Sequence, residues 1–554
     1  MRGLFLSSGL LLCGCSSLLA QDTNKRKTID VTSTFKPVLR EASKINFSTI
    51  PPAADTSRPR LSYSIPAQNL FFSYMPAELK PVALQIDSVS SWDYSNFIKA
   101  GIGNVHQPYL KAGFSFGDGK NTFFNVFASH FTSKGSRTFQ KNNATSVGAA
   151  VTYKTKSNLE WNGSLGFSSD DYFLYGYQPD TIKYEKKELR RRYQTFEGKI
   201  NLRNTVPTEF GLTYNPGIRV SVFGDGRTTR GSEANTVVTL PLEKSFGEDF
   251  TFGLGAVADL TNYRLKGLST GKNTINNNLY QVPIALAYKS TNFYIHGGII
   301  PSWEKKDFSL LPNVMADITT SDKKLTLQLG YIGYFEKGSY QRFASINPWL
   351  IQPDSLLLNT KVTELYGGLK GSLGDHFSYS AKFGYLRYRN TPLFVNDYEA
   401  DTTGKQFSVI YEPKMDVARA HGEVVYTVGE KFSATAGVTY SHFAKLQKEE
   451  KAWGMIPVEY NVGLRWQLIK NLWLNSELWA FDGAQYRAKN NGPSKDAAAV
   501  DLSAGVEFQI TRNFNLWVQL NNIFNNEYQR WHQYHVYGFN ILGGITYSFN
   551  QKKK

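Results

Sequence analysis

The sequence predicts an all-β protein: a transmembrane antiparallel β-barrel of about 22 strands, preceded by a short Pro-rich N-terminal segment. The first observation is composition: 37 Phe, 32 Tyr and 10 Trp stand beside 46 Gly, a mixture rich in strand formers. Second, only 41% of residues are hydrophobic and the mean hydropathy is -0.35, without an apolar run long enough for a membrane-spanning helix. Third, polar and apolar residues alternate from about residue 95 onward, as in strands that face lipid on one side and water on the other.

The first 20 residues predict a secretory signal peptide. One cation, Arg2, precedes the apolar stretch from Leu4 to Leu12, and the small residue Ala20 stands before Gln21. The run from Leu12 to Cys15 also resembles a lipobox, which leaves open an alternative cleavage before Cys15 with a lipid on its thiol. Cleavage after Ala20 removes both cysteines, which excludes a disulfide scaffold and a cysteine metal site.

The next segment, residues 21–94, holds seven of the 21 prolines. Proline lacks the donor needed for strand ladders and disfavours helix, so this arm is expected to be extended or irregular, apart from a short helix near Leu39–Ser43.

From residue 95 to 549 the chain reads as strands with a period of two. Examples are 196–203, 458–467, 500–510 and 514–521, each with one apolar and one polar face. A soluble sandwich or propeller also alternates, but here the polar faces carry charges in strand after strand. The polar residues expected to face the lumen are Glu197, Lys199, Arg203, Glu459, Arg465, Asp501 and Glu507.

Turn lengths give the strand count. Short turns are expected at 117–121, 156–158, 204–208, 245–249, 289–292, 319–324, 371–376, 428–431, 468–471 and 510–513. Longer connections are expected at 169–190, 337–359, 389–403, 445–455, 483–497 and 525–536. Ten short turns imply eleven hairpins and hence about 22 strands, to within two. The first strand begins near Asn96, and residues 404–428 form one long strand with a bulge or bend near Pro413–Lys414.

The last strand carries the most specific motif. Its apolar face ends at Tyr547 and Phe549, which resembles the signal recognised by the barrel-assembly machinery, although a basic tail, residues 550–554, follows. Just upstream, Asn522–Tyr528 and Tyr537–Phe539 resemble the C-terminal end of TonB-dependent receptors. The close resemblance covers about 35 residues, and the strand count extends it, with low specificity, over residues 95–549.

The resemblance implies uptake of a scarce, bulky ligand such as an iron chelate, cobalamin or a glycan, energised by TonB, through a barrel filled by an N-terminal plug. Residues 21–94 are too few for such a plug. Thr28–Thr32 faintly resembles the TonB box, which pairs by strand addition. The alternative is that this stretch belongs to an ordered periplasmic arm or to a strip of chain inside the lumen. A lumen of this width needs filling, by this arm, by inward-folded loops or by a partner protein. We expect the arm to enter it at least partly, because Phe71, Phe72, Tyr74 and Met75 favour burial.

No catalytic or cofactor motif is found, and neither an enzyme nor a cofactor is expected. The closest histidine pair, His532 and His535, could ligate a metal or haem, but its neighbours favour an aromatic contact surface. The candidate surface ligand contacts are Tyr528, Trp531, His532, Tyr534 and His535.

The net charge of +16 alone could indicate a nucleic-acid partner, but the export signal argues against one. Basic residues cluster at 186–192 and 487–495. They could meet lipopolysaccharide phosphates or form a solvated loop surface, and lumenal cations would favour anionic solutes. Trp161 and Trp466 are expected in the aromatic girdles, whereas Trp473, Trp479 and Trp517 have the parity of the inner face.

The function expected is uptake or binding of a substrate at the surface of the outer membrane, through a multi-pass barrel similar to TonB-dependent receptors but without a full plug. Two alternatives remain: a passive porin-like channel, and a structural barrel within an outer-membrane complex. The expected partners are outer-membrane lipid and lipopolysaccharide, the barrel-assembly machinery, and TonB or another envelope protein.

Overall fold

The computed structural model describes residues 95–550, except 119, 228–229, 269–270 and 355. The predictions for the signal peptide, Cys15, the Pro-rich arm, the Thr28–Thr32 box and the tail beyond residue 550 lie outside the described residues. Neither helix in this part of the chain has the length and apolarity to cross a membrane.

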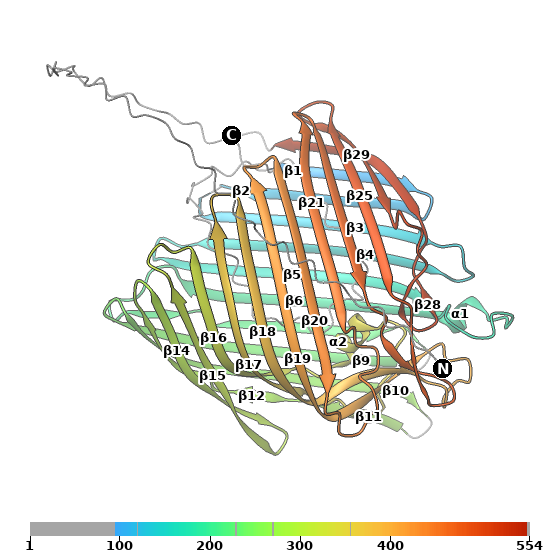
Figure 1. The fold of residues 1–554 in the computed structure, drawn as a ribbon, viewed down its shortest axis with the longest axis horizontal. Coiled ribbons are helices and arrows are strands. Elements are labelled where there is room, and N and C mark those ends of the chain that lie inside the picture. Colours follow the sequence, from blue (N-terminus) through green and yellow to red (C-terminus); the bar gives the residue numbers. More distant parts are fainter. Residues whose placement is uncertain (1–94, 119, 228–229, 269–270, 355, 551–554) are drawn as a thin grey trace, which may run out of the picture. The chain divides into compact units, whose positions relative to one another are not determined.

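The described chain forms one closed antiparallel barrel of 22 strands (Figure 1). It begins with β1 (Ser95–Gly103), β2 (His106–Gly117), β3 (Thr122–Lys134), β4 (Lys141–Lys154), β5 (Leu159–Phe173), α1 (Lys186–Leu189), β6 (Arg190–Asn204), β7 (Leu212–Tyr214), β8 (Gly217–Asp225), β9 (Arg230–Phe246), β10 (Phe250–Leu268), β11 (Gly271–Asn276), β12 (Leu279–Gln281), β13 (Ile284–Lys289) and β14 (Phe293–Glu304). It continues with β15 (Asp307–Thr319), β16 (Leu325–Glu336), α2 (Tyr340–Ile346), β17 (Thr360–Leu373), β18 (Phe377–Asn396), β19 (Phe407–Val428), β20 (Phe432–Ala444), β21 (Val458–Ile469), β22 (Leu472–Phe481), β23 (Gln485–Arg487), β24 (Pro493–Lys495), β25 (Ala499–Gln509), β26 (Phe514–Asn521), β27 (Gln529–Trp531), β28 (Tyr534–His535) and β29 (Asn540–Asn550). Segments β7 and β8 make one barrel strand, because both pair with β9, and β11 to β13 make another, because all three pair with β10. The hairpins β23–β24 and β27–β28 lie outside the barrel sheet.

All ten predicted short turns join neighbouring strands at one end of the barrel, here called the turn end. The longer connections lie at the opposite end, the loop end. The connection predicted at 389–403 is wrong in its bounds: β18 continues to Asn396 and β19 begins at Phe407, so the connection is residues 397–406. In the first of these turns the Asp118 carboxylate accepts backbone N–H bonds from Lys120, Asn121 and Thr122, as Asp often does in turns. Parity of turn lengths therefore predicted the strand number correctly.

The barrel closes where β1 pairs with β29, from Ser95 opposite Asn550 to Gly103 opposite Leu542. The predicted first and last strands are confirmed. Close backbone approach at this seam requires glycine, because a Cβ atom on Gly544 would lie 1.9 Å from the Ala100 carbonyl oxygen.

Gly544→Ala is therefore expected to hinder closure of the barrel and to reduce the folded, heat-modifiable band on a gel. Gly543→Ala is the matched control, since a Cβ atom there meets no atom closer than 3.5 Å, an ordinary contact distance. Equal folded yields for the two variants would contradict the seam geometry.

The β18–β19 hairpin bends rather than bulges. Strand β19 runs unbroken through Pro413, as predicted, and opposite it Asn390 has a φ of 57°. The pairing register is the same on both sides of this point, Arg389 opposite Lys414 and Thr391 opposite Glu412, so no extra residue is inserted. Beyond the bend the hairpin tip is buried at Thr391 and along residues 392–396.

The outer face of the barrel is an apolar band between two belts of exposed aromatic rings. The turn-end belt includes Phe124, Tyr153, Trp161, Phe250, Trp466, Phe514 and Tyr547; the loop-end belt includes Phe167, Trp303, Phe308, Phe383, Tyr440 and Phe539. Exposed aliphatic side chains such as Leu165 and Ile545 lie between the belts. This is the lipid-facing pattern of a transmembrane barrel, with Trp161 and Trp466 in the predicted place.

The three tryptophans of inner-face parity are buried, which the sequence left without an explanation. The Trp479 Nε1 donates to Glu459 at 2.7 Å, while Arg465 lies 4.5 Å from the Trp473 ring and Lys99 4.2 Å from the Trp517 ring. Cation–π and hydrogen-bond partners thus accommodate large rings on a polar wall.

Candidate functional site

The long connections turn inward and form a hydrophobic cap over the loop end of the lumen. We call the cap the connections 174–189, 337–359 and 522–539 together with the tip of the β18–β19 hairpin. Figure 1 shows α1, α2 and β28 gathered at this end of the strands. Nineteen buried side chains of the described chain pack into one cluster there, seven of them from connection 337–359.

The cap spans the ring of strands. Strand β6 is the sixth of the 22 and β19 is the sixteenth, so the two stand on nearly opposite sides. From the β6 side, the guanidinium of Arg191 donates to Gln406, next to β19, at 3.3 Å. The Tyr534 hydroxyl donates to the Lys405 carbonyl, and the Trp349 indole donates to the Phe173 carbonyl at 3.0 Å. These bonds join opposite walls through the cap.

Helix α2 is held by carboxylates of the wall. Ser339 caps its N-terminus by accepting from the backbone N–H of Arg342, while Glu233 of β9 accepts from the backbone N–H of Tyr340 at 2.6 Å. The Tyr340 hydroxyl donates to Asp225 of β8 at 2.6 Å. Burial raises the pKa of Tyr340 well above its ordinary value, which keeps this hydroxyl protonated as a donor.

A second anchor fixes the β20–β21 connection, residues 445–457. The carboxylate of Glu412 is completely buried and accepts backbone N–H bonds from Lys414, Gln447, Lys448 and Glu449. A buried carboxylate with several N–H donors replaces its lost hydration by protein hydrogen bonds. Sequence reasoning missed Glu412, because nothing in the strand pattern distinguishes it from other polar positions.

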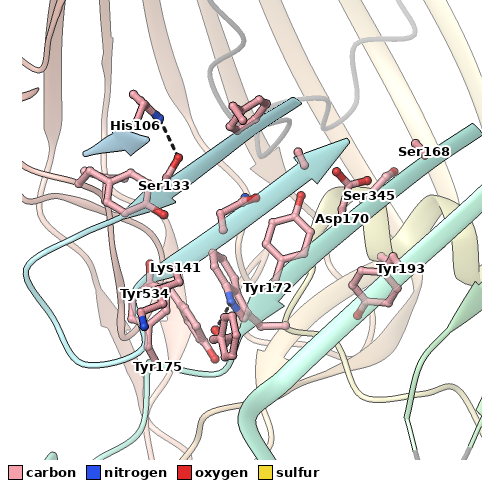
Figure 2. Close-up of a pocket in the computed structure, with 18 of the residues that line it drawn as sticks. His106, Ser133, Lys141, Ser168, Asp170, Tyr172, Tyr175, Tyr193, Ser345 and Tyr534 are labelled. Atoms are coloured by element: carbon pink, nitrogen blue, oxygen red, sulfur yellow. Dashed lines mark hydrogen bonds between the residues drawn. The ribbon is translucent and has the colours of Figure 1, made fainter. Parts of the chain in front are cut away.

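Beneath the cap lies a cavity of about 470 Å³ (Figure 2). Its aromatic lining includes Tyr172, Tyr175, Tyr193, Trp349, Tyr528, Tyr534 and Tyr537, and its polar lining includes His106, Ser129, Ser133, Lys141, Ser168, Asp170 and Ser345. Figure 2 shows the labelled members of this lining, among them Tyr172, Tyr193 and Tyr534, on wall strands and on the cap. The His106 Nδ1 lies 2.7 Å from the Ser133 hydroxyl oxygen. Aromatic faces beside hydroxyl groups suit a ligand with both apolar and hydrogen-bonding surfaces.

The five candidate surface contacts are not a surface cluster. Tyr528, Trp531 and Tyr534 are buried, with 6%, 2% and 2% exposure, so the expectation of exposed rings is corrected: the loop that carries them folds into the cap. Tyr528, Tyr534 and His535 line the cavity, and a ligand contact by these residues stays a prediction.

The two histidines of that loop do not converge. His532 lies 2.9 Å from Asp496 and stacks on Tyr486, whereas the His535 ring meets the Glu527 carbonyl oxygen. Within residues 95–550, leaving aside the few undescribed positions, no cluster of three His, Cys, Asp or Glu side chains is placed to hold a metal ion.

The seven polar residues predicted to face the lumen have the parity opposite to the exposed apolar residues on their strands, and they make several local pairs. Glu197 pairs with Arg219, Arg203 with Glu160, Glu459 with Trp479, Arg465 with Trp473, Asp501 with Tyr528 and Glu507 with Asn515; Lys199 is exposed. A role in solute selection stays a prediction.

The two basic clusters are partly neutralised. Arg190 and Arg192 both bind Asp171, at 2.6 and 2.8 Å. Arg487 pairs with Glu449 and Lys495 pairs with Asp482. Lipopolysaccharide contact at these clusters stays a prediction.

No known family model matches the sequence, and no curated protein matches it. Solved structures of bacterial outer-membrane receptors do share its fold. They include the pyoverdine receptor FpvA from Pseudomonas aeruginosa, at a TM-score of 0.62 and 11% identity over 82% of this chain and 79% of that one. A mutant of the ferric enterobactin receptor PfeA from the same organism matches at 0.61 and 11%, over 83% and 80%. The iron transporter FrpB from Neisseria meningitidis matches at 0.63 and 9%, over 83% and 82%. The chain therefore has a TonB-dependent receptor-like barrel fold, as the resemblance of its last strands implied.

Proposed function

We propose that this chain is an outer-membrane receptor barrel that binds a substrate at the cell surface and takes it up through a lumen closed on the loop side. The observation that carries the proposal is the cap. An open barrel of this width would pass solutes freely, whereas here buried contacts join opposite walls across the lumen. Opening such a barrier requires a ligand or a partner that stabilises a different arrangement of the loops.

The cavity beneath the cap is the proposed place of the substrate inside the barrel. Its tyrosine rings and serine hydroxyls favour a ligand that stacks and hydrogen-bonds, and its few charged groups, among them Lys141 and Asp170, do not favour a highly charged one. The substrate would first meet the outer surface of the cap, so entry into the cavity and opening of the cap are one event.

The proposed partners follow from the exposed surfaces of the described chain. Lipid covers the apolar band between the two aromatic belts, and lipopolysaccharide phosphates meet the cations near Arg190 and Arg192. The barrel-assembly machinery recognises the terminal strand through Tyr547 and Phe549. The energy source is TonB or another envelope protein, acting from the turn end without a full plug.

The test is affinity purification of the full chain from native outer membranes, followed by identification of bound proteins and small molecules. The proposal predicts a co-purifying small molecule that is lost when Tyr175 and Tyr534, on the cavity wall, are both changed to Ala. If the folded barrel co-purifies with proteins in stoichiometric amounts and with no small molecule, the result would instead support a structural role. High conductance of the intact purified barrel would support a passive channel.

A further inference from the structure

One buried strip of the inner wall runs along the seam where β1 pairs with β29. We call it the seam strip: Lys99, Glu507, Asn515, Trp517 and Thr546, from the four adjoining strands β1, β29, β26 and β25. All five side chains are buried, Lys99 to 1% exposure and Thr546 completely. They are neighbours in register, because Lys99 faces Thr546, Thr546 faces Asn515 and Trp517 faces Glu507.

Some inner-face residues on other strands, such as Glu233 and Glu364, are also buried but have partners among the described residues, whereas others are exposed. Lys199 on β6 and Arg465 on β21 are exposed, and the side chains of Glu197 and Arg219 are each more than two-fifths exposed. The seam strip differs from these positions because three of its buried polar atoms have no hydrogen-bond partner among the described residues.

Three polar atoms of the strip lack a hydrogen-bond partner among the described residues: Lys99 Nζ, Trp517 Nε1 and Thr546 Oγ1. A buried ammonium or indole N–H without an acceptor is costly, and the stacking of Lys99 over the Trp517 ring replaces only part of its hydration. All three atoms can donate. The occupant that covers them must therefore present acceptors, such as backbone carbonyl or carboxylate oxygens.

We propose that the seam strip is the docking surface for residues 51–94 of this same chain. That segment leads directly into β1 at Ser95, and Lys99 lies only about 13 Å further along the strand at its usual rise per residue. Its own residues supply what the strip lacks: carbonyl oxygens along the whole segment, the carboxylates Glu78, Asp87 and Asp93, and the rings of Phe71, Phe72 and Tyr74.

The docking needs no plug domain. An extended segment lying along one side of a wide lumen covers such a strip without filling the barrel. The proposal is independent of the nature of any substrate, because it concerns only how the chain covers its own wall.

Site-directed thiol cross-linking of the full-length purified barrel tests the proposal, since both native cysteines, Cys13 and Cys15, fall within the first 20 residues. Thr546→Cys is combined with single cysteines at Phe72, Tyr74, Asp87 or Asp93, and Lys199→Cys on the exposed wall is the matched control. Glu507→Cys serves as a second anchor, and the heat-modifiable gel shift verifies that each variant folds.

After oxidation and tryptic digestion, mass spectrometry should detect disulfides from at least one segment position to both seam anchors, with yields about tenfold or more above those to Lys199→Cys, because docking raises the effective thiol concentration. Equal yields at the seam and control positions would overturn the proposal. So would folded variants without links, or links from the seam anchors to a separate polypeptide.

Discussion

Replacing residues 337–359 by a short Gly-Ser turn is expected to convert a closed barrel into an open channel. This connection supplies seven of the nineteen side chains in the cap cluster and all of α2. Its removal takes away much of the packing between the β5–β6 side and β18–β19 and leaves few contacts across the lumen, such as the bond from Arg191 to Gln406. Conductance in planar bilayers should rise by about tenfold or more, since a lumen of this strand number is far wider than a small solute.

The matched control shortens another loop-end connection that contributes nothing to that cluster. Removing the β23–β24 hairpin, Gln485–Lys495, should leave conductance near the level of the intact barrel, because this hairpin forms its own sheet. If both variants conduct alike, the cap is not the barrier to solutes. That result would favour a passive channel over a receptor as the function of the barrel.

Glu412→Ala is expected to release the β20–β21 connection. The substitution leaves backbone N–H groups of Gln447, Lys448 and Glu449 without their buried acceptor. Together with the cavity it creates, this loss should cost about 3 kcal/mol of local stability. Because the closed connection loses that much stability, it opens about a hundredfold more often, and each opening exposes Lys448 and Lys451 to trypsin.

Limited proteolysis of the purified barrel, followed by mass spectrometry of the first fragments, measures this effect. Glu430→Ala is the control, because Glu430 lies exposed in the short turn between β19 and β20 and no described hydrogen bond depends on it in the connection. Cleavage at an unchanged rate in Glu412→Ala would show that the connection is held by its apolar contacts instead.

The barrel could be predicted from the sequence because the signals for its strands and turns are local. Period-two alternation and short turns are properties of neighbouring residues, and they located the ten turns, the first strand and the unbroken strand through Pro413. The bend opposite Pro413 depends on the φ of Asn390, which no pattern of apolar residues reveals. Inner tryptophans were placed by parity, but alternation does not tell which side chain each one meets. Glu459 and Arg465 reach Trp479 and Trp473 from the neighbouring strand β21, and Lys99 reaches Trp517 from β1, at the other end of the described chain.

The cap could not be predicted from the sequence, because it depends on contacts between loops that are far apart in the chain. Tyr528, Trp531 and Tyr534 stand in a long connection, where aromatic residues look like an exposed contact surface. Trp531 and Tyr534 instead pack into the cap cluster, and Tyr528 packs against Trp479 and Phe481 of β22. One signal was available: connection 337–359 carries Tyr340, Phe343, Trp349 and Leu350 after a Ser at a helix-capping position. A long loop with that many apolar residues is better explained by inward folding than by exposure.

The central claim is that the loops bridge the lumen from wall to wall, and a cross-link between wall and cap measures it most directly. Ser221 of β8 donates to the side chain of Gln341 in α2 at 2.8 Å, so Ser221→Cys with Gln341→Cys should be joined within one chain by a short bis-thiosulfonate reagent in isolated outer membranes. Ser221→Cys with Asn490→Cys, at the exposed β23–β24 turn, should not be joined. Efficient linkage of the first pair alone is the predicted result; two free thiols in the first pair, both labelled by a water-soluble maleimide, would contradict it.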